Sequence, residues 1–302
     1  MTYAPGKKRH SKSSTVFVTS ILYIFLTITV LVVVYPVAFT IGAAFTETNS
    51  LASTRLVPWP EKPSFYQFQR LLTPSSQTVV GTVDVRGTNY LVWYRNTLKI
   101  AIVNTLCTLA ICVTSGYIFS RFRFRARKPM MATIVVLQMF PSFIGMIATY
   151  VILWRIGGLN THWGLILVYV TGSIPFNSWL MKGYFDTAVS KSIEEAARVD
   201  GANQITTFIK IVIPMVKPMI MFLALSSFTS PWMDFIFPRL ILRSDDKKTL
   251  AVGLFELING RANDNFTMFA AGALLVAVPF AILFMSGQKF LLKSMAGDGT
   301  KE

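Results

Sequence analysis

The sequence has few of the residues on which disulfide frameworks and metal sites depend. Its two cysteines, Cys107 and Cys112, lie within one apolar run and lack C-x-x-C spacing. Neither a disulfide framework nor a metal site is indicated. We interpret both cysteines as packing residues.

Motifs for nucleotide binding and hydrolysis are absent as well. The chain has no GxxxxGK[ST] phosphate loop, no HExxH zinc motif and no plausible nucleophile–base set. We predict that it neither binds nor hydrolyses ATP by itself, uses no cofactor and is not an enzyme.

Charge is scarce in this chain. Only 14% of the 302 residues are charged whereas 53% are hydrophobic, which is too apolar for an ordinary soluble domain. The net charge of +15 raises the question of nucleic acid, but Lys and Arg fall in short clusters between apolar runs. This pattern indicates a membrane protein in contact with lipid and argues against a nucleic-acid partner.

Six stretches are apolar enough to cross a hydrocarbon core, which needs roughly 20 residues of helix. We expect an all-α membrane protein with six transmembrane helices, because lipid cannot satisfy exposed backbone groups and barrel-like alternation is absent. The basic start "KKRHSK" resembles a signal peptide, but the apolar run at 16–45 is too long for one and predicts a retained first span. The six spans are expected near residues 16–41, 96–119, 130–153, 164–181, 216–237 and 268–290.

No fixed-period repeat or flexible linker divides the chain, so one membrane domain is expected. We predict an N-terminal segment 1–15, a first transmembrane helix in 16–45 and a loop 46–95. A core at 96–291 then holds five spans and an internal loop 182–215, and a tail at 292–302 follows.

Basic loops predict the orientation. The stretch "RFRFRARK", residues 121–128, is strongly basic, whereas the loop after the third span carries only Arg155. We therefore place 121–128 in the cytoplasm. With six spans, the N- and C-termini also face the cytoplasm, and the loops 46–95 and 238–267 face out.

The stretch "SIEEAARVDGANQITTFIKIVIP", residues 192–214, is charged although apolar runs flank it. Ser192 and Glu195 fit a capping box, so a helix is expected to begin there and to end at Gly201. A second helix from about residue 203 should bury one face, and Pro214 should kink or end it. That buried face is expected to contain Ile205, Phe208, Ile209 and Val212.

Spacing alone favours a capped hairpin that merely connects two spans. Its length, however, indicates a role beyond connection, since passive connections between helices in bundles take roughly 2 to 8 residues. The small Ala196 and Ala197 beside Glu195 would also let a partner approach the backbone closely.

Glu195-Ala196-Ala197, Gly201 and the later I-x-I-P resemble the EAA loop of ATP-binding-cassette (ABC) importer permeases, with pattern EAA-x3-G-x9-I-x-L-P; Ile213 stands where Leu is usual. In that family the loop is the helix that docks on the cytoplasmic ATPase. The resemblance implies an ATPase-coupling role for Glu194, Glu195, Ala196, Ala197, Arg198, Asp200 and Gly201.

The likeness extends over roughly residues 90–302. "GLNTHWGLIL", "MKGYFDT", "KTLAVGL" and "QKFLLKSMAGDGTKE" resemble the MalG-type permeases of maltose and maltodextrin importers. This resemblance implies a type I importer (MetI-like) fold in the bacterial cytoplasmic membrane. The partners implied are a second permease in a heterodimer, two ATPase subunits and an extracytoplasmic sugar-binding protein.

The segment "LINGRANDNF", residues 257–266, is polar and reads as an external turn. By resemblance it aligns with the loop that reaches into the docked sugar-binding protein. The contact residues expected there are Asn259, Gly260, Arg261, Asn263, Asp264 and Asn265.

Several residues near the spans have two interpretations. Lys99 and Asp234 are functional candidates at membrane depth, although interfacial anchoring is favoured. Aromatic side chains suit sugar stacking, yet interfacial belts explain most of them. Prolines could break helices around a substrate path, or simply reflect their frequency in membrane helices. The aromatic residues are Trp163, Trp179, Trp232 and Tyr169, and the prolines are Pro141, Pro175, Pro231 and Pro279.

Two alternative functions stay open at this point. One is an ABC importer permease for another sugar, since permease sequence fixes the substrate weakly. The other is an ion-coupled secondary transporter, which predicts acidic residues at mid-membrane and an internal repeat; the spans show neither clearly.

Overall fold

The computed structural model describes residues 12–48, 59–74, 87–139, 142–259 and 265–297. Within these ranges the secondary structure is helical, apart from one isolated β-bridge between Pro74 and Thr88. The all-α prediction is confirmed for this part of the chain.

Four helices are long and apolar enough to cross a membrane: α1 (Lys12–Ala44), α3 (Tyr90–Arg121), α6 (His162–Ala188) and α13 (Phe266–Gly297). A fifth crossing arises if Gln204–Met215 and α10 (Lys217–Met233), bent by 77°, count as one span. These helices coincide with predicted spans one, two, four, five and six. Apart from α10, each is longer than its predicted span.

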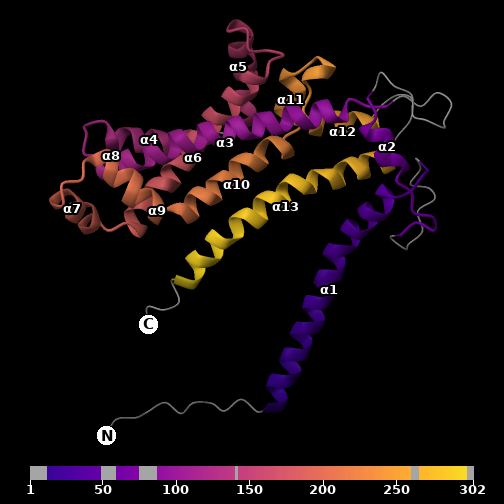
Figure 1. Ribbon diagram of the computed structural model, residues 1–302, viewed down its shortest axis with the longest axis horizontal. Helices are drawn as coiled ribbons and strands as arrows, with labels where there is room; N and C mark the ends of the chain where they lie inside the picture. The colour runs from indigo at the N-terminus through magenta and orange to yellow at the C-terminus, as the bar shows by residue number, and fades with distance from the viewer. Residues whose placement is uncertain (1–11, 49–58, 75–86, 140–141, 260–264, 298–302) are drawn as a thin grey trace.

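The third predicted span is not one helix. The stretch 130–153 is divided between α4 (Arg127–Gln138) and α5 (Ser142–Arg155), each shorter than a membrane crossing needs. In Figure 1, α4 lies along the bundle whereas α5 turns away from it. Pro141 lies between the two in the sequence; proline donates no backbone hydrogen bond and disfavours helix in the preceding residue. The expectation of a single continuous helix here is wrong.

The centre of the molecule is formed by α3, α6 and α10, which run side by side (Figure 1). Polar side chains join them: Asn104 donates to the Ser227 carbonyl at 2.8 Å, and the Ser115 and Ser178 hydroxyls lie 2.8 Å apart. A β-carbon on Gly116 would lie 2.6 Å from that of Met181, so α3 and α6 approach too closely there for any larger residue. Small residues and interhelical hydrogen bonds are the usual means of packing membrane helices.

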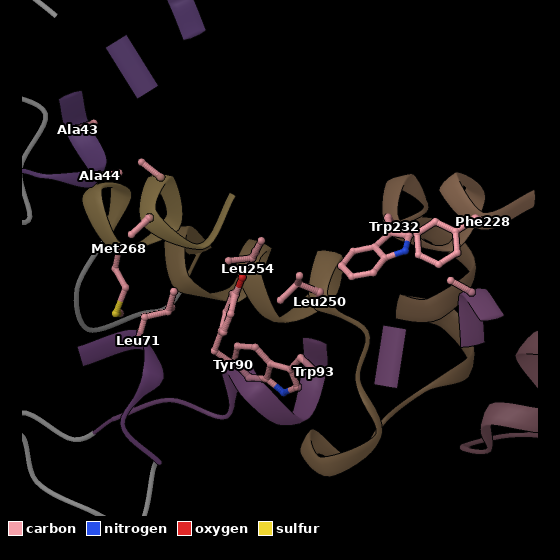
Figure 2. Close-up of a cluster of buried hydrophobic side chains, with 13 residues drawn as sticks. Ala43, Ala44, Leu71, Tyr90, Trp93, Phe228, Trp232, Leu250, Leu254 and Met268 are labelled. Atoms are coloured by element: carbon pink, nitrogen blue, oxygen red, sulfur yellow. The ribbon is translucent and has the colours of Figure 1, made fainter. Parts of the chain in front are cut away.

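One end of the bundle is closed by three short helices: α2 (Tyr66–Leu72), α11 (Ile236–Ile241) and α12 (Leu250–Asn259). We call it the outer end, after the orientation predicted from the sequence. The predicted loops 46–95 and 238–267 are therefore partly helical, and α3 begins at Tyr90, inside the first of them. Figure 2 shows the apolar cluster beneath these helices. In it, Trp93 packs so tightly against α12 that a β-carbon on Gly253 would lie 2.1 Å from the indole ring.

Among the described residues, the buried side chains of helix α1 lie near its C-terminal end. Ala43 and Ala44 are buried with Met268 of α13, whereas the apolar side chains from Phe17 to Tyr35 are exposed. In Figure 1, α1 diverges from the bundle toward the N-terminus. So much exposed apolar surface is expected to face lipid or another subunit.

Candidate functional site

The charged stretch between α6 and α10 folds as a helical hairpin at the end of the bundle opposite α12 (Figure 1). We call residues 191–215 the coupling hairpin, after the role that the EAA resemblance implies. Its elements are α7 (Lys191–Val199), α8 (Gln204–Thr207), a π-helical turn (Phe208–Val212) and α9 (Ile213–Met215).

The start of α7 differs from the predicted capping box. The helix begins at Lys191, with Ser190 in extended conformation as its N-cap, and no side chain caps it. The hydroxyl of Ser192 lies 2.7 Å from that of Ser190. Because Ser192 is already inside the helix, it cannot serve as the N-cap, and Glu195 lies beyond the first turn. The capping-box expectation is wrong.

The turn at Gly201 confirms the sequence prediction. Gly201 has φ +87°, in the left-handed region. Its N–H donates to the Arg198 carbonyl at 3.0 Å, and the N–H of Ala202 donates to the Ala197 carbonyl at 2.9 Å. This pair of bonds is the Schellman motif, which satisfies the last carbonyls of a helix and fixes the direction in which the chain leaves.

Glu194 is the buried acidic residue of the hairpin, with 1% of its surface exposed. Its carboxylate accepts hydrogen bonds from the Arg121 Nε at 2.5 Å and from the Tyr117 hydroxyl at 2.9 Å. Both partners lie in the last turns of α3. The hairpin is therefore attached to a transmembrane helix through a charge-assisted, buried contact.

The guanidinium of Arg121 joins three elements at once. Besides Glu194 it donates to the carbonyls of Val189 at 2.6 Å and Phe185 at 3.2 Å, at the end of α6. A further bond reaches the Ser120 hydroxyl, which in turn donates to Asp186. This role was not predicted, because in the sequence Arg121 is only the first of five cations in the basic segment 121–128. Its position just after the predicted span 96–119 carries no further signal.

The second half of the hairpin also packs against α3. The rings of Tyr117 and Phe208 lie 4.5 Å apart, and Val212 is fully buried. Ile205 and Ile209, however, are 70% and 53% exposed. The prediction of a buried face is therefore wrong for two of its four residues. The π-helical turn adds a residue to the repeat, so the 3.6-residue spacing used for that prediction does not hold. Pro214 does not end this segment: it lies within α9, and the chain bends by 77° after Met215, before α10.

The outward face of the hairpin carries most of the remaining residues implied by the EAA resemblance. Glu195, Ala196, Arg198 and Asp200 are exposed, whereas Ala197 is buried beside Glu194. Apolar side chains accompany them: Val199 is 87% exposed and Ile193 is 40% exposed. A rigid surface of mixed charged and apolar residues at a helix turn is suited to a protein interface.

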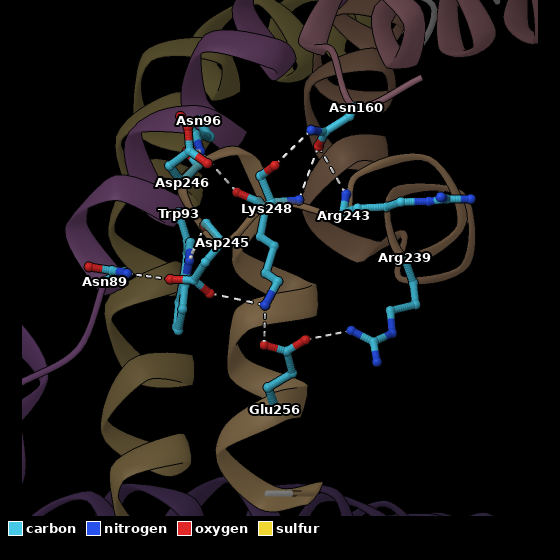
Figure 3. Close-up of polar contacts among 11 residues, drawn as sticks. Asn89, Trp93, Asn96, Asn160, Arg239, Arg243, Asp245, Asp246, Lys248 and Glu256 are labelled. Carbon is cyan, nitrogen blue, oxygen red and sulfur yellow. Dashed lines mark hydrogen bonds and ion pairs between the residues drawn. The ribbon is translucent and has the colours of Figure 1, made fainter. Parts of the chain in front are cut away.

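The outer end is held by a second set of polar contacts, shown in Figure 3. Asn96 of α3 donates to the carbonyls of Asp246 and Lys248 at 2.8 and 3.0 Å. Asn160, before α6, accepts from the backbone N–H groups of Arg243 and Ser244, both at 3.0 Å. The segment between α11 and α12 is thereby fixed to the outer ends of α3 and α6.

Lys248 holds the beginning of α12 in this network. Its ammonium donates to Asp245 at 3.0 Å and to Glu256 at 2.6 Å, and Glu256 also pairs with Arg239. Burial alone would lower the pKa of Lys248, but hydrogen bonds and charge attraction from Glu256 and Asp245 raise it above its ordinary value. Lys248 is therefore a stable cation that joins the two carboxylates.

The predicted external contact loop is only partly described. Asn259 is the last residue of α12 and is exposed; Asn265 is buried, and its side chain accepts from Arg70 at 3.4 Å. Gly260, Arg261, Asn263 and Asp264 lie outside the described residues. The two ends of the loop are held together, since the N–H of Asn265 donates to the Leu257 carbonyl at 3.0 Å.

A cavity of about 860 Å³ lies between α5, α6, α10 and α11. Of the four aromatic residues considered for sugar stacking, Tyr169 lines it; Trp163 and Trp179 are exposed, and Trp232 is buried in the cluster of Figure 2. The Tyr169 hydroxyl donates to Asp234 at 2.9 Å.

Asp234 also stabilises the start of α11. Its carboxylate accepts from the N–H groups of Ile236 at 2.9 Å and Phe237 at 3.4 Å, at the start of α11. Together with the bond from Tyr169, these contacts join α6 to the start of α11 at the edge of the cavity, and interfacial anchoring of Asp234 stays a prediction.

Comparison with known proteins decides the family. Residues 109–297 match the family described as "Binding-protein-dependent transport system inner membrane component". The chain belongs to this family of ABC permeases. The secondary-transporter alternative is thereby set aside.

Several relatives are named as permeases of oligosaccharide transport systems. The chain is 38% identical to the galactooligosaccharides transport system permease protein GanQ of Bacillus subtilis, over 92% of this chain and 94% of that protein. It is also 38% identical to the maltodextrin transport system permease protein MdxG of the same organism, over 92% and 95%. With the maltodextrin transport system permease protein MalD of Streptococcus pneumoniae the identity is 37%, over 93% and 95%.

Solved structures support the fold. A bacterial ABC transporter involved in the import of the acidic polysaccharide alginate matches with a TM-score of 0.76 at 24% identity, over 94% of this chain and 99% of that one. The MetNI methionine ABC transporter matches with a TM-score of 0.53 at 15% identity, over 67% and 93%. The chain is thus an integral protein of the bacterial cytoplasmic membrane and a permease subunit, not an enzyme.

Proposed function

We propose that this chain is one permease subunit of an ATP-driven, binding-protein-dependent importer of maltose and maltodextrins, and that the coupling hairpin transmits the motion of the ATPases to the transmembrane helices. The observation that carries this proposal is the buried contact of Glu194 with Arg121 and Tyr117. It attaches the hairpin to the membrane bundle while leaving Glu195, Ala196 and Arg198 exposed for a partner.

The proposed mechanism is rigid coupling. Arg121 bonds to α7 through Glu194 and to the end of α6 through two carbonyls. The hairpin also continues through the bent segment into α10. A displacement of the hairpin would therefore act on α3, α6 and α10 together. ATP-driven closure of two ATPase subunits would move the bundle between inward- and outward-facing packings.

The proposed topology places six spans across the membrane, with α4 and α5 together forming the third. The hairpin, the basic segment 121–128, residues 1–15 and the tail would face the cytoplasm, as the distribution of Lys and Arg favours. The outer end with α2, α11 and α12 would face the other side.

Four partner subunits follow from this proposal: a second permease, two ATPases and an extracytoplasmic sugar-binding protein. The second permease would cover part of the exposed apolar surface, and lipid the rest. The loop from Asn259 to Asn265 would contact the sugar-binding protein. The residues that flank it are joined by the hydrogen bond from the Asn265 N–H to the Leu257 carbonyl.

The substrate has one competing candidate. The relatives GanQ and MdxG are equally identical to this chain, and their names give galactooligosaccharides and maltodextrins. A galactooligosaccharide importer is therefore the second candidate, and the two share the same coupling mechanism.

Sugar uptake by the whole transporter tests the proposal. The permease pair, ATPase and binding protein would be reconstituted in proteoliposomes, and ATP-dependent uptake of maltotriose and of a galactotriose would be measured. Preferential maltotriose uptake supports the maltodextrin assignment, whereas preferential galactotriose uptake selects the second candidate. Uptake that persists without ATP or without binding protein would contradict the coupling mechanism itself.

A further inference from the structure

A basic cavity of about 630 Å³ lies where the chain leaves α3 and enters α4, beside α6. Its apolar walls come from Phe124 and Met131. Five cations line it: Arg123, Arg125, Arg127, Lys128 and Lys182. A role in membrane topology explains why these cations lie on one side of the membrane. It does not explain why they surround one cavity.

The charges of this cavity are largely unmatched. Lys182 pairs with Asp186 at 2.8 Å, and that carboxylate also accepts from Ser120. Within the described ranges, the other four cations have no ion pair with an acidic side chain, and no Asp or Glu lines the cavity. Like charges held together repel one another, and a bound anion would offset that repulsion.

An exposed apolar surface continues directly from the cavity. Helix α4 begins at Arg127 and buries none of its residues within the described chain. Met130, Val135, Val136 and Leu137 are each 47–55% exposed. A ligand that fits both features has an anionic head and an apolar body.

We propose that this cavity binds the phosphate of an anionic phospholipid, such as phosphatidylglycerol, with its acyl chains along the exposed face of α4. The planar guanidinium group of arginine binds phosphate oxygens through paired, charge-assisted hydrogen bonds. Basic pockets between membrane helices on the cytoplasmic side commonly hold anionic headgroups. Free inorganic phosphate shares the head chemistry but would leave the apolar surface of α4 uncovered.

Lipid retention by the intact transporter tests the proposal. The delipidated complex would be titrated with phosphatidylglycerol and the bound lipid counted by native mass spectrometry. Arg127→Gln combined with Lys128→Gln should weaken phosphatidylglycerol binding at the tightest site on the order of thirtyfold. Each cation near an anionic headgroup contributes about 1 kcal/mol of binding free energy, and 1.4 kcal/mol corresponds to a tenfold change in affinity. The control variant combines Lys210→Gln with Lys217→Gln. It also removes two positive charges, from exposed residues outside the cavity, and should leave the affinity of the tightest site unchanged.

Four outcomes would overturn the proposal, three from lipid affinities and one from competition with phosphate. The first is equal phosphatidylglycerol affinity in the cavity variant and the unsubstituted complex, and the second is an equal loss in the control variant. The third needs no substitution: phosphatidylcholine binding as tightly as phosphatidylglycerol would exclude a site selective for anionic lipid. Competition by millimolar inorganic phosphate separates the two sources of phosphate, since complete displacement of the lipid would indicate a free-anion site instead.

Discussion

The guanidinium of Arg121, at the end of α3, lies 2.5 Å from the carboxylate of Glu194 in α7, and both side chains are at least 95% buried. The two residues are 73 positions apart in the chain. A buried ion pair of this kind contributes little net stability when complete, but losing one partner leaves an unpaired buried charge. The contact therefore fixes where the hairpin sits on the bundle.

Replacing Glu194 by Ala should loosen the hairpin. The substitution leaves Arg121 buried without its counter-charge, at a cost of about 3–5 kcal/mol. We expect faster hydrogen exchange across residues 191–215 and loss of sugar uptake, while α12 at the outer end keeps its protection. Glu195→Ala is the matched control for exchange, because Glu195 is the exposed neighbour. Unchanged exchange in Glu194→Ala would show that the ion pair does not hold the hairpin.

Replacing Glu195 by Ala should weaken ATPase attachment without altering the fold. Glu195 has no capping role, and substitutions at such surface positions usually change stability by within about 0.5 kcal/mol. The measurement is the amount of ATPase that copurifies with the membrane-embedded permease. If copurification and uptake both equal those of the unsubstituted protein, Glu195 is not a docking residue.

Gly201→Val should abolish uptake before it reduces the level of the protein in the membrane. The left-handed φ of +87° costs a residue with a β-carbon roughly 1–2 kcal/mol, whereas nothing lies within 4 Å to obstruct the side chain itself. Gly201→Asn is the control, because Asn tolerates this conformation and should retain most of the uptake. Full uptake by the Val variant would make the hairpin a simple tether, and loss of the protein would assign Gly201 to folding.

Tags should report the proposed orientation. A tag after Lys128 is expected to be protected from a membrane-impermeant reagent in intact cells, and a tag within residues 259–265 is expected to be labelled. The physical reason is the retention of short, Arg-rich loops on the cytoplasmic side. The reverse labelling pattern would place the hairpin on the wrong side for a cytoplasmic ATPase.

The features that sequence predicted well are those with local causes. Gly201 ends α7 because only glycine takes its backbone conformation easily, and long apolar runs form α1, α3, α6 and α13 because lipid requires helix. The division of the third span into α4 and α5 was not predicted, although Pro141 lies at that point. An apolar run has the same composition whether it forms one long helix or two short ones, so composition alone does not predict the break.

The features that sequence did not predict depend on packing. Glu194 and Glu195 are chemically identical neighbours, and only the position of α3 decides that the first is buried against Arg121. In the same way, a fixed 3.6-residue period does not hold through the π-helical turn at 208–212, where Ile209 is exposed, and it did not predict the exposure of Ile205 in α8. The resemblance to the EAA loop identified the hairpin as a unit but did not separate its inward from its outward residues.

The central claim is that the outward face of the hairpin docks on the ATPase, and photocrosslinking from Val199 tests it most directly. Val199 is 87% exposed at the end of α7, so a photoreactive residue there should not disturb the packing. Ile282, 61% exposed on α13, is the control position. In the assembled transporter, we predict a crosslinked adduct with the ATPase subunit from position 199 and none from position 282. No adduct from position 199, or equal adducts from both positions, would contradict the account.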